Sequence, residues 1–136
     1  NKKIVFTNGC LDIIHRGHLK LLHEAKKLGD MLIVGLNSDK SIKLIKGNSR
    51  PIMNNKNRSY LLASISFVDL IIFFNEPTPL KLITTIKPDI LVKGGEYNKK
   101  DIIGYDFMKK NNKKICLVSM EKNYSSSNII KYINTI

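Results

Sequence analysis

IVFTNGCLDIIHRGH, residues 4–18, is the stretch that decides the fold of this chain. Three apolar residues open it, as in a short buried strand, and a turn containing Asn8 and Gly9 follows. His15 and His18 then stand at the start of a helix, on one face because they are three residues apart. Unpaired backbone N–H groups and the positive end of the helix dipole attract phosphate there. The stretch therefore predicts a polyphosphate site on a strand–turn–helix unit.

Two other interpretations compete for these histidines. Histidines near a helix start are often surface residues or helix caps, but the position directly after a strand and a glycine turn favours ligand binding. A zinc site is disfavoured, because Cys10 has no C-x-x-C partner and Cys116 is far away in the sequence.

Short apolar runs alternate with helical patterns along the whole chain. Strands are predicted at residues 4–8, 31–36, 68–74, 89–92 and 114–119, and helices at 17–28, 39–44, 56–66, 77–87, 105–111 and 128–133. This alternation predicts an α/β fold, a Rossmann-like parallel sheet with helices on both faces, in a single domain of residues 1–136. Ligands in such sheets bind at the carboxyl ends of the strands.

The composition limits the class of protein. The chain has 136 residues, 43% of them hydrophobic, and only two cysteines, which predicts a compact domain in the reducing cytoplasm. No apolar run approaches the roughly 20 residues of a membrane span, and no signal-peptide pattern opens the chain, so we expect no membrane partner.

The net charge of +12 indicates anionic ligands. Its lysines are scattered and arginine occurs only at positions 16, 50 and 58, so we expect no nucleic acid as a partner. The same charge would attract anionic substrates such as a triphosphate and a sugar phosphate. A basic module that binds RNA or DNA remains the remote alternative. The sequence lacks G-x-G-x-x-G and G-x-x-x-x-G-K-[ST], which excludes the usual dinucleotide and P-loop sites.

Three further segments carry candidate phosphate ligands. Ser125, Ser126 and Ser127 precede the last helix, where hydroxyl groups cap the helix and also donate to phosphate oxygens. Lys93 ends a predicted strand and is followed by two glycines, of which Gly94 lets the chain turn beneath a ligand. Lys46 begins the basic loop KGNSRP, residues 46–51.

These segments resemble, in order, the HxGH nucleotidyltransferase superfamily, and most closely the heptose-phosphate adenylyltransferase domain of ADP-heptose synthesis. The relevant strings are TNGCLD, HRGH, NSD, KGNSRP, PDILVKGGEY and SSSNII, spread between Ile4 and Ile133. The family's arginine ahead of the serines, in an RTEGIS-type string, is replaced here by Lys122-Asn123-Tyr124. That departure argues against a glycerol-phosphate cytidylyltransferase.

The resemblance implies a role for particular residues. His15, His18 and Lys93 would be the catalytic residues, stabilising charge in the transition state. The nucleotide would be bound by Thr7, Asn8, Gly9, His15, Gly17, His18, Lys46, Arg58, Ser125, Ser126 and Ser127. The acceptor would be bound by Asp12, Asp39, Gly94 and Glu96, although Asp12 could equally orient His15. No residue is predicted to bind a metal directly.

The resemblance also implies a reaction: ATP and D-glycero-D-manno-heptose 1-phosphate would give ADP-heptose and pyrophosphate for the lipopolysaccharide core. Mg²⁺ would arrive with ATP. A transferase of the same fold that uses CTP or GTP and another acceptor, such as glycerol 3-phosphate, is the nearer alternative. The resemblance is compatible with two arrangements of the chain, a homodimer and a fusion behind a sugar-kinase domain.

Overall fold

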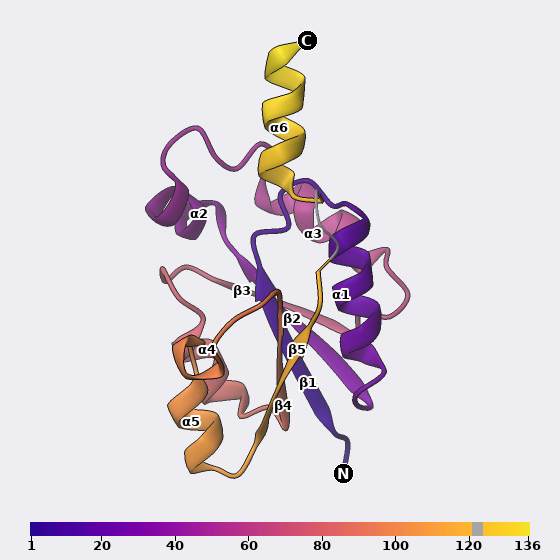
Figure 1. Cartoon of the computed structure of the whole chain (residues 1–136), viewed down its shortest axis with the longest axis vertical. Helices are drawn as coiled ribbons and strands as arrows, with labels where there is room; N and C mark the ends of the chain where they lie inside the picture. Colours follow the sequence, from indigo (N-terminus) through magenta and orange to yellow (C-terminus); the bar gives the residue numbers. More distant parts are fainter. Residues whose placement is uncertain (121–123) are drawn as a thin grey trace.

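The computed structural model describes residues 1–120 and 124–136. Five strands form one parallel sheet in the order β3-β2-β1-β4-β5 (Figure 1). They are β1 (Ile4–Gly9), β2 (Met31–Asn37), β3 (Leu70–Phe74), β4 (Ile90–Gly94) and β5 (Lys114–Val118). The register pairs Val5 of β1 with Leu32 on one side and with Ile90 on the other. The predicted Rossmann-like parallel sheet is therefore confirmed.

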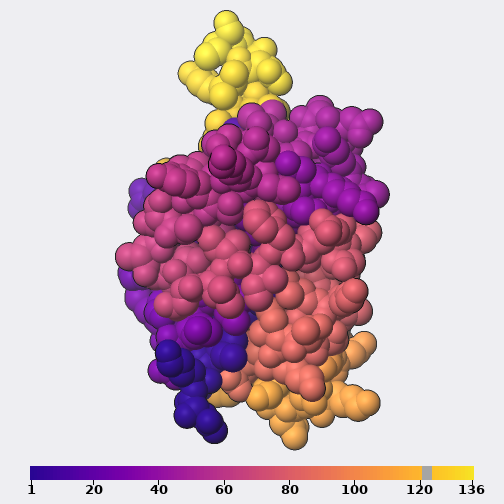
Figure 2. Space-filling view, turned by 180° about the vertical axis from the view of Figure 1, so that it is seen from behind, coloured from indigo at the N-terminus to yellow at the C-terminus, as the bar shows by residue number. Residues whose placement is uncertain are grey.

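Helices cover both faces of the sheet, as predicted. They are α1 (Arg16–Lys26), α2 (Asp39–Lys46), α3 (Asn55–Ala63), α4 (Leu80–Ile86), α5 (Tyr105–Lys110) and α6 (Ser126–Thr135), with a 3₁₀ turn η1 (Lys99–Asp101). In Figure 1, α1 and α3 lie on one side of the sheet and α4 and α5 on the other. The last helix, α6, projects beyond the body of the molecule, as both Figure 1 and Figure 2 show. None of the helices in the described ranges is long and apolar enough to cross a bilayer.

The two faces of the sheet bury separate hydrophobic clusters, because successive side chains of a strand point to opposite faces. Val5 packs with Leu22 of α1 and Leu62 of α3, whereas Phe6 packs with Ile83 of α4 and other apolar residues on the second face. Both Val5 and Phe6 are completely buried. This double burial explains why each inner strand begins with a run of apolar residues.

Some predicted boundaries and environments differ from the structure. Residues 68–74 were predicted as a buried strand. The strand begins at Leu70 and lies at the edge of the sheet, and the side chains of Leu70 and Phe73 are 43% and 42% exposed. The helix predicted from residue 77 begins at Leu80. Strand order, which local sequence does not encode, decides which strand is the edge.

The chain order locates the ligand edge. From β1 the chain moves outward through β2 to β3, and then crosses back to β4 on the other side of β1. The boundary between β1 and β4 is therefore the topological switch point, where open α/β sheets bind ligands. At this boundary the Lys93 ammonium donates to Asn8 Oδ1 at 2.9 Å, joining the carboxyl ends of the two strands.

Candidate active site

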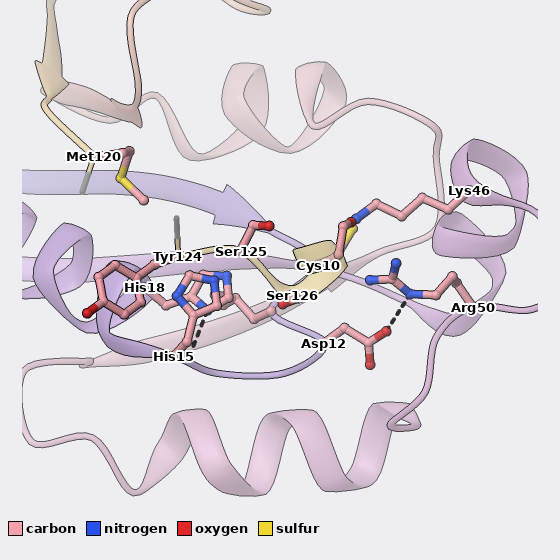
Figure 3. Close-up of a pocket in the computed structure, with 12 residues that line it drawn as sticks. Cys10, Asp12, His15, His18, Lys46, Arg50, Met120, Tyr124, Ser125 and Ser126 are labelled. Carbon is pink, nitrogen blue, oxygen red and sulfur yellow. Dashed lines mark hydrogen bonds and ion pairs between the residues drawn. The ribbon is translucent and has the colours of Figure 1, made fainter. Parts of the chain in front are cut away.

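A cleft of about 270 Å³ lies beyond the carboxyl end of β1 (Figure 3). Three parts of the chain line it: the segment between β1 and α1, the end of α2 with its following loop, and the region where α6 begins. The lining residues are Cys10, Leu11, Asp12, His15, His18, Lys46, Arg50, Met120, Tyr124, Ser125, Ser126 and Ser127. The cleft thus collects the predicted histidines, Lys46 and all three serines from distant parts of the sequence.

The two histidines cap helix α1 and each other's backbone. His15 is the N-cap residue, and its Nδ1 accepts a hydrogen bond from the Gly17 N–H at 3.1 Å. The His15 N–H in turn donates to Nδ1 of His18 at 3.2 Å. The pair forms a capping box in which imidazole nitrogens replace the usual oxygens. The rings stack with centroids 3.8 Å apart and planes inclined by 30°.

This capping decides where the imidazole protons lie. Because each Nδ1 accepts from a backbone N–H, a neutral ring must carry its proton on Nε2, on the side away from the backbone. Burial lowers the pKa of His15, and burial followed by repulsion from His15 and Lys46 lowers the pKa of His18 to about 4. Both rings are therefore neutral near pH 7, and each offers one Nε2–H donor at the cleft.

Gly17 is required by this stacked pair. A Cβ at position 17 would stand 2.9 Å from Cε1 and 3.1 Å from Nδ1 of the His15 ring. A contact of 2.9 Å is essentially never seen at a real Cβ atom, so another residue would require the imidazole that caps α1 to shift. The glycine between the histidines thus protects the geometry of the pair, and Gly17 itself does not line the cleft.

The serines fix the start of α6 against the segment that precedes α1. Ser125 caps α6 by accepting from the Asn128 N–H at 3.0 Å. The Ser126 hydroxyl donates to the Ile13 carbonyl at 2.8 Å and accepts from the Ile13 N–H at 3.3 Å. The predicted cap is confirmed, and contact of these serines with phosphate stays a prediction. Lys122 and Asn123, the site of the departure from the family pattern, lie outside the described residues.

Asp12 anchors the basic loop after α2. Its carboxylate accepts from Arg50 Nε and the Ile52 N–H, both at 2.9 Å, and from the Met53 N–H at 2.8 Å. Burial opposes ionisation of Asp12, but the two backbone N–H groups and the Arg50 guanidinium outweigh it and lower its pKa. Its oxygens bind the loop, and none of these three hydrogen bonds reaches His15. A role of Asp12 in binding the acceptor or in orienting His15 stays a prediction.

Arg58 has a different place from the predicted phosphate contact. The side chain is completely buried, and its guanidinium has five N–H donors for five acceptors. These acceptors are the carbonyls of Met53, Cys10 and Asn37 and the side-chain oxygens of Asp39 and Asn55, at 2.6–2.9 Å. Arg58 therefore ties the carboxyl ends of β1 and β2 to α3. Asp39, predicted to bind the acceptor, is its ion-pair partner at 2.8 Å.

Six other predicted residues do not line the cleft. They are Thr7, Asn8, Gly9, Lys93, Gly94 and Glu96. Burial lowers the pKa of Lys93, whose ammonium is held by Asn8 at the switch point. Gly94 leaves room for Met120, because a Cβ there would come within 2.6 Å of the Met120 sulfur. Glu96 is exposed in the turn after β4. Ligand contacts for these six residues stay predictions.

Sequence reasoning missed several residues of the cleft. Cys10, Leu11, Arg50, Met120 and Tyr124 line it. The sequence could have indicated two of them, because Arg50 belongs to the KGNSRP string and Cys10 to the TNGCLD string, both of which resemble the family. Burial raises the pKa of the Cys10 thiol, with smaller opposing effects of the nearby cations. Cys10 is therefore a neutral part of the wall near pH 7.

The cleft does not fit a protein-held metal ion. Among residues 1–120 and 124–136, no three His, Cys, Asp or Glu side chains come together in a way that could hold one. Asp12 is the carboxylate that lines the cleft, and its oxygens already accept three N–H groups. The arrival of Mg²⁺ with ATP stays a prediction.

Comparisons with known proteins agree with this architecture. The Bifunctional protein HldE of Helicobacter pylori (strain P12) is 54% identical over 132 residues, which cover 97% of this chain and 28% of that protein. Its counterpart from Campylobacter jejuni subsp. doylei is 52% identical over 133 residues, again with 28% of that protein covered. The chain thus spans less than a third of the length of these relatives, and its description as one complete domain stays a prediction.

Solved structures share the fold. The lipopolysaccharide core biosynthesis protein from Thermoplasma volcanium GSS1 is 28% identical with a TM-score of 0.71, covering 92% of this chain and all of that one. Pantoate-beta-alanine ligase from Francisella tularensis, at 20% identity, has a TM-score of 0.66 and shares the fold alone. The Cytidylyltransferase-like family matches residues 6–132, which include the histidine pair and the serines of α6. By this match and by its fold, the chain belongs to the cytidylyltransferase-like family of nucleotidyltransferases.

Proposed function

We propose that this chain transfers an adenylyl group from Mg·ATP to D-glycero-D-manno-heptose 1-phosphate, giving ADP-heptose and pyrophosphate for lipopolysaccharide core synthesis. The observation that carries the proposal is the capped histidine pair, which offers two Nε2–H donors in the cleft. The 54% identity to Bifunctional protein HldE supports the choice of acceptor. The name of the Thermoplasma volcanium relative, a lipopolysaccharide core biosynthesis protein, agrees with the use of the product.

The reaction is a direct displacement. An oxygen of the acceptor's phosphate attacks the α-phosphorus of ATP, the bond from that phosphorus to the oxygen bridging to the β-phosphorus breaks, and pyrophosphate leaves with the electron pair. No covalent enzyme intermediate is needed, which fits a cleft whose one thiol, Cys10, has a raised pKa. The chain therefore acts by positioning and by stabilising charge.

The wall of the cleft supplies that stabilisation. His15 and His18 donate their Nε2–H groups to the oxygens of the triphosphate, and the Ser127 hydroxyl at the start of α6 adds a further donor. Lys46 brings positive charge from the end of α2. The neutral state of the imidazoles matters, because protonation of Nδ1 would break the caps that aim them. Mg²⁺ that arrives with the nucleotide would neutralise part of the charge of its phosphates.

A product assay over a panel of substrates tests the proposal. The chain is incubated with ATP, CTP or GTP together with heptose 1-phosphate or glycerol 3-phosphate, and nucleotide sugars and pyrophosphate are quantified by chromatography. We expect ADP-heptose from ATP, with the other nucleotides at least about tenfold less efficient, since one lost hydrogen bond to a base costs that much. A His15→Ala preparation controls for contaminating enzymes.

The same panel of substrates also tests the alternative transferases. Turnover of CTP or GTP, or of glycerol 3-phosphate in place of the heptose, would replace this proposal by another transferase of the same family. Because ATP is the substrate, the proposal places the reaction in the cytoplasm. A homodimer and a fusion to a sugar-kinase domain stay predictions.

A further inference from the structure

Arg50 lines the cleft and has a buried side-chain nitrogen that donates to no residue in the described part of the chain. Its Nε is bound to Asp12 Oδ2 at 2.9 Å, and its side chain is only 12% exposed. Its Nη2 is buried and has no hydrogen-bond partner among the described residues. A buried N–H group without a partner destabilises the folded chain. Because Arg50 lines the cleft, a bound ligand is the natural acceptor for this atom.

The position of Arg50 distinguishes it from the histidines. In Figure 3, His15 and His18 lie on one side of Cys10, and Lys46 and Arg50 lie on the other. The imidazoles are neutral near pH 7, so the positive charge of the cleft is concentrated at the side of Lys46 and Arg50. This division gives the cleft one end with neutral donors and one end with cations.

We propose that Arg50 binds the phosphate monoester of the acceptor substrate, and that Asp12 is the residue that positions it. The inference rests on the proposed function, which places the triphosphate at the histidines. In-line displacement requires the attacking oxygen and the leaving pyrophosphate to lie on opposite sides of the α-phosphorus. If the histidines hold the leaving group, the acceptor's phosphate must approach from the side of Arg50.

The chemistry of the two phosphates agrees with this assignment. The triphosphate would arrive with part of its charge neutralised by metal, so Lys46 and the neutral N–H donors suffice for it without Arg50. The acceptor's phosphate arrives as a dianion without a metal, and a guanidinium is the side chain best matched to its oxygens. The bond from Asp12 to Nε fixes the plane of the guanidinium and leaves the Nη2 edge for the ligand.

The test measures phosphate binding and kinetics in three single variants. Arg50→Gln removes the cation but keeps one N–H for Asp12, so the loop after α2 retains its anchor. Lys43→Gln is the matched control, because it removes one positive charge from an exposed position of α2. Asp12→Asn keeps the size of the side chain but turns an NH₂ group toward N–H donors, and so frees Arg50 to reorient. Circular dichroism confirms that each variant is folded.

Binding of inorganic phosphate is measured by calorimetry in the presence of a non-hydrolysable ATP analogue. We expect the Kd for phosphate to rise about 10- to 100-fold in Arg50→Gln, as for a lost charged hydrogen bond, and to stay within about twofold in Lys43→Gln. In turnover, the KM for the acceptor should rise by a similar factor while the KM for ATP changes little. Arg50→Lys should recover part of the loss, and Asp12→Asn should raise the acceptor KM as well.

Two outcomes would overturn the inference. Unchanged phosphate affinity in Arg50→Gln would remove the anion site, whichever sugar the enzyme uses. A rise confined to the KM for ATP would move Arg50 to the nucleotide. Both results are separate from a failure of the proposed function, which would show as absence of ADP-heptose in the wild-type reaction.

Discussion

The caps formed by the histidines predict how the stability of this fold depends on pH. The pKa of His18 falls from 6.5 to about 4 in the folded chain, mainly because the ring is buried. Between these two values, the unfolded chain binds a proton that the folded chain does not. The contribution of His18 to the free energy of unfolding is therefore fully present above about pH 6.5. It falls as the pH drops toward 4 and stays constant below that.

The size of the effect follows from the same shift. A difference of one unit in pKa corresponds to about 1.4 kcal/mol. The fall in the pKa of His18 from 6.5 to about 4 therefore means that acidification lowers the free energy of unfolding by about 3 kcal/mol. The matched variant is His18→Gln. A glutamine at the third helical position can still accept from the His15 N–H and complete the capping box, but it does not titrate.

Urea denaturation of both proteins at pH 4 to 8 measures this difference. The carboxylates with lowered pKa values, Asp12, Asp69 and Asp89, also cost stability in acid, but they are common to both proteins and cancel. We expect the wild type to lose about 2–3 kcal/mol more than His18→Gln between pH 7 and pH 4. Equal losses within about 0.5 kcal/mol would refute the reasoning, because the His18 ring would then titrate freely.

Three further predictions concern ligand binding and catalysis. His15→Ala should lower kcat, measured by steady-state kinetics, by about two to four orders of magnitude through lost transition-state stabilisation. The lost helix cap should lower the free energy of unfolding by about 1 kcal/mol, which melting curves measure. A near-normal kcat would show that His15 does not belong to the site. Mg·ATP at a concentration 100 times its Kd should stabilise the chain by about 2.7 kcal/mol in a thermal shift assay, and mass spectrometry during turnover should detect no covalent nucleotide adduct. Lys93→Met should lower kcat/KM about 30- to 1000-fold, because we expect the ammonium to leave Asn8 for a phosphate in the complex. A fall of less than about threefold would contradict this and would leave Lys93 the role of joining the strands.

The order of strands and helices along the chain could be predicted from the sequence, because strands buried on both faces of a sheet have apolar residues at successive positions. The central strands β1 and β2 each begin with an apolar run, residues 4–6 and 31–34, and the helices that follow them carry apolar stripes and caps, such as Ser38 at the start of α2. The environment of β3 was not readable in this way. Its sequence is as apolar as that of β2, and only the crossover to β4 makes it an edge strand with Leu70 and Phe73 exposed.

The site residues divide in the same way. The histidines and the serines meet in the cleft because they stand where helices begin, and Lys46 joins them from the end of α2. Arg58 and Asp12 could not be placed from sequence, since a charged residue in a ligand motif can point into the cleft or behind its wall. The structure places Arg58 behind the wall with five acceptors, and gives Asp12 the loop that carries Arg50. Long-range hydrogen bonds of this kind have no local pattern.

The histidine pair shows why a cap and a ligand site are compatible uses of the same residues. An imidazole has two nitrogens on opposite sides of the ring, and a backbone N–H that binds Nδ1 leaves Nε2 as the donor. The cap therefore fixes the tautomer, the ring orientation and the neutral state that a phosphate donor in this cleft requires. Serine or aspartate in these positions would cap α1 as well but would have no second, opposed donor. The spacing H-x-G-H follows from the same geometry, with the glycine providing the space in which the two rings stack.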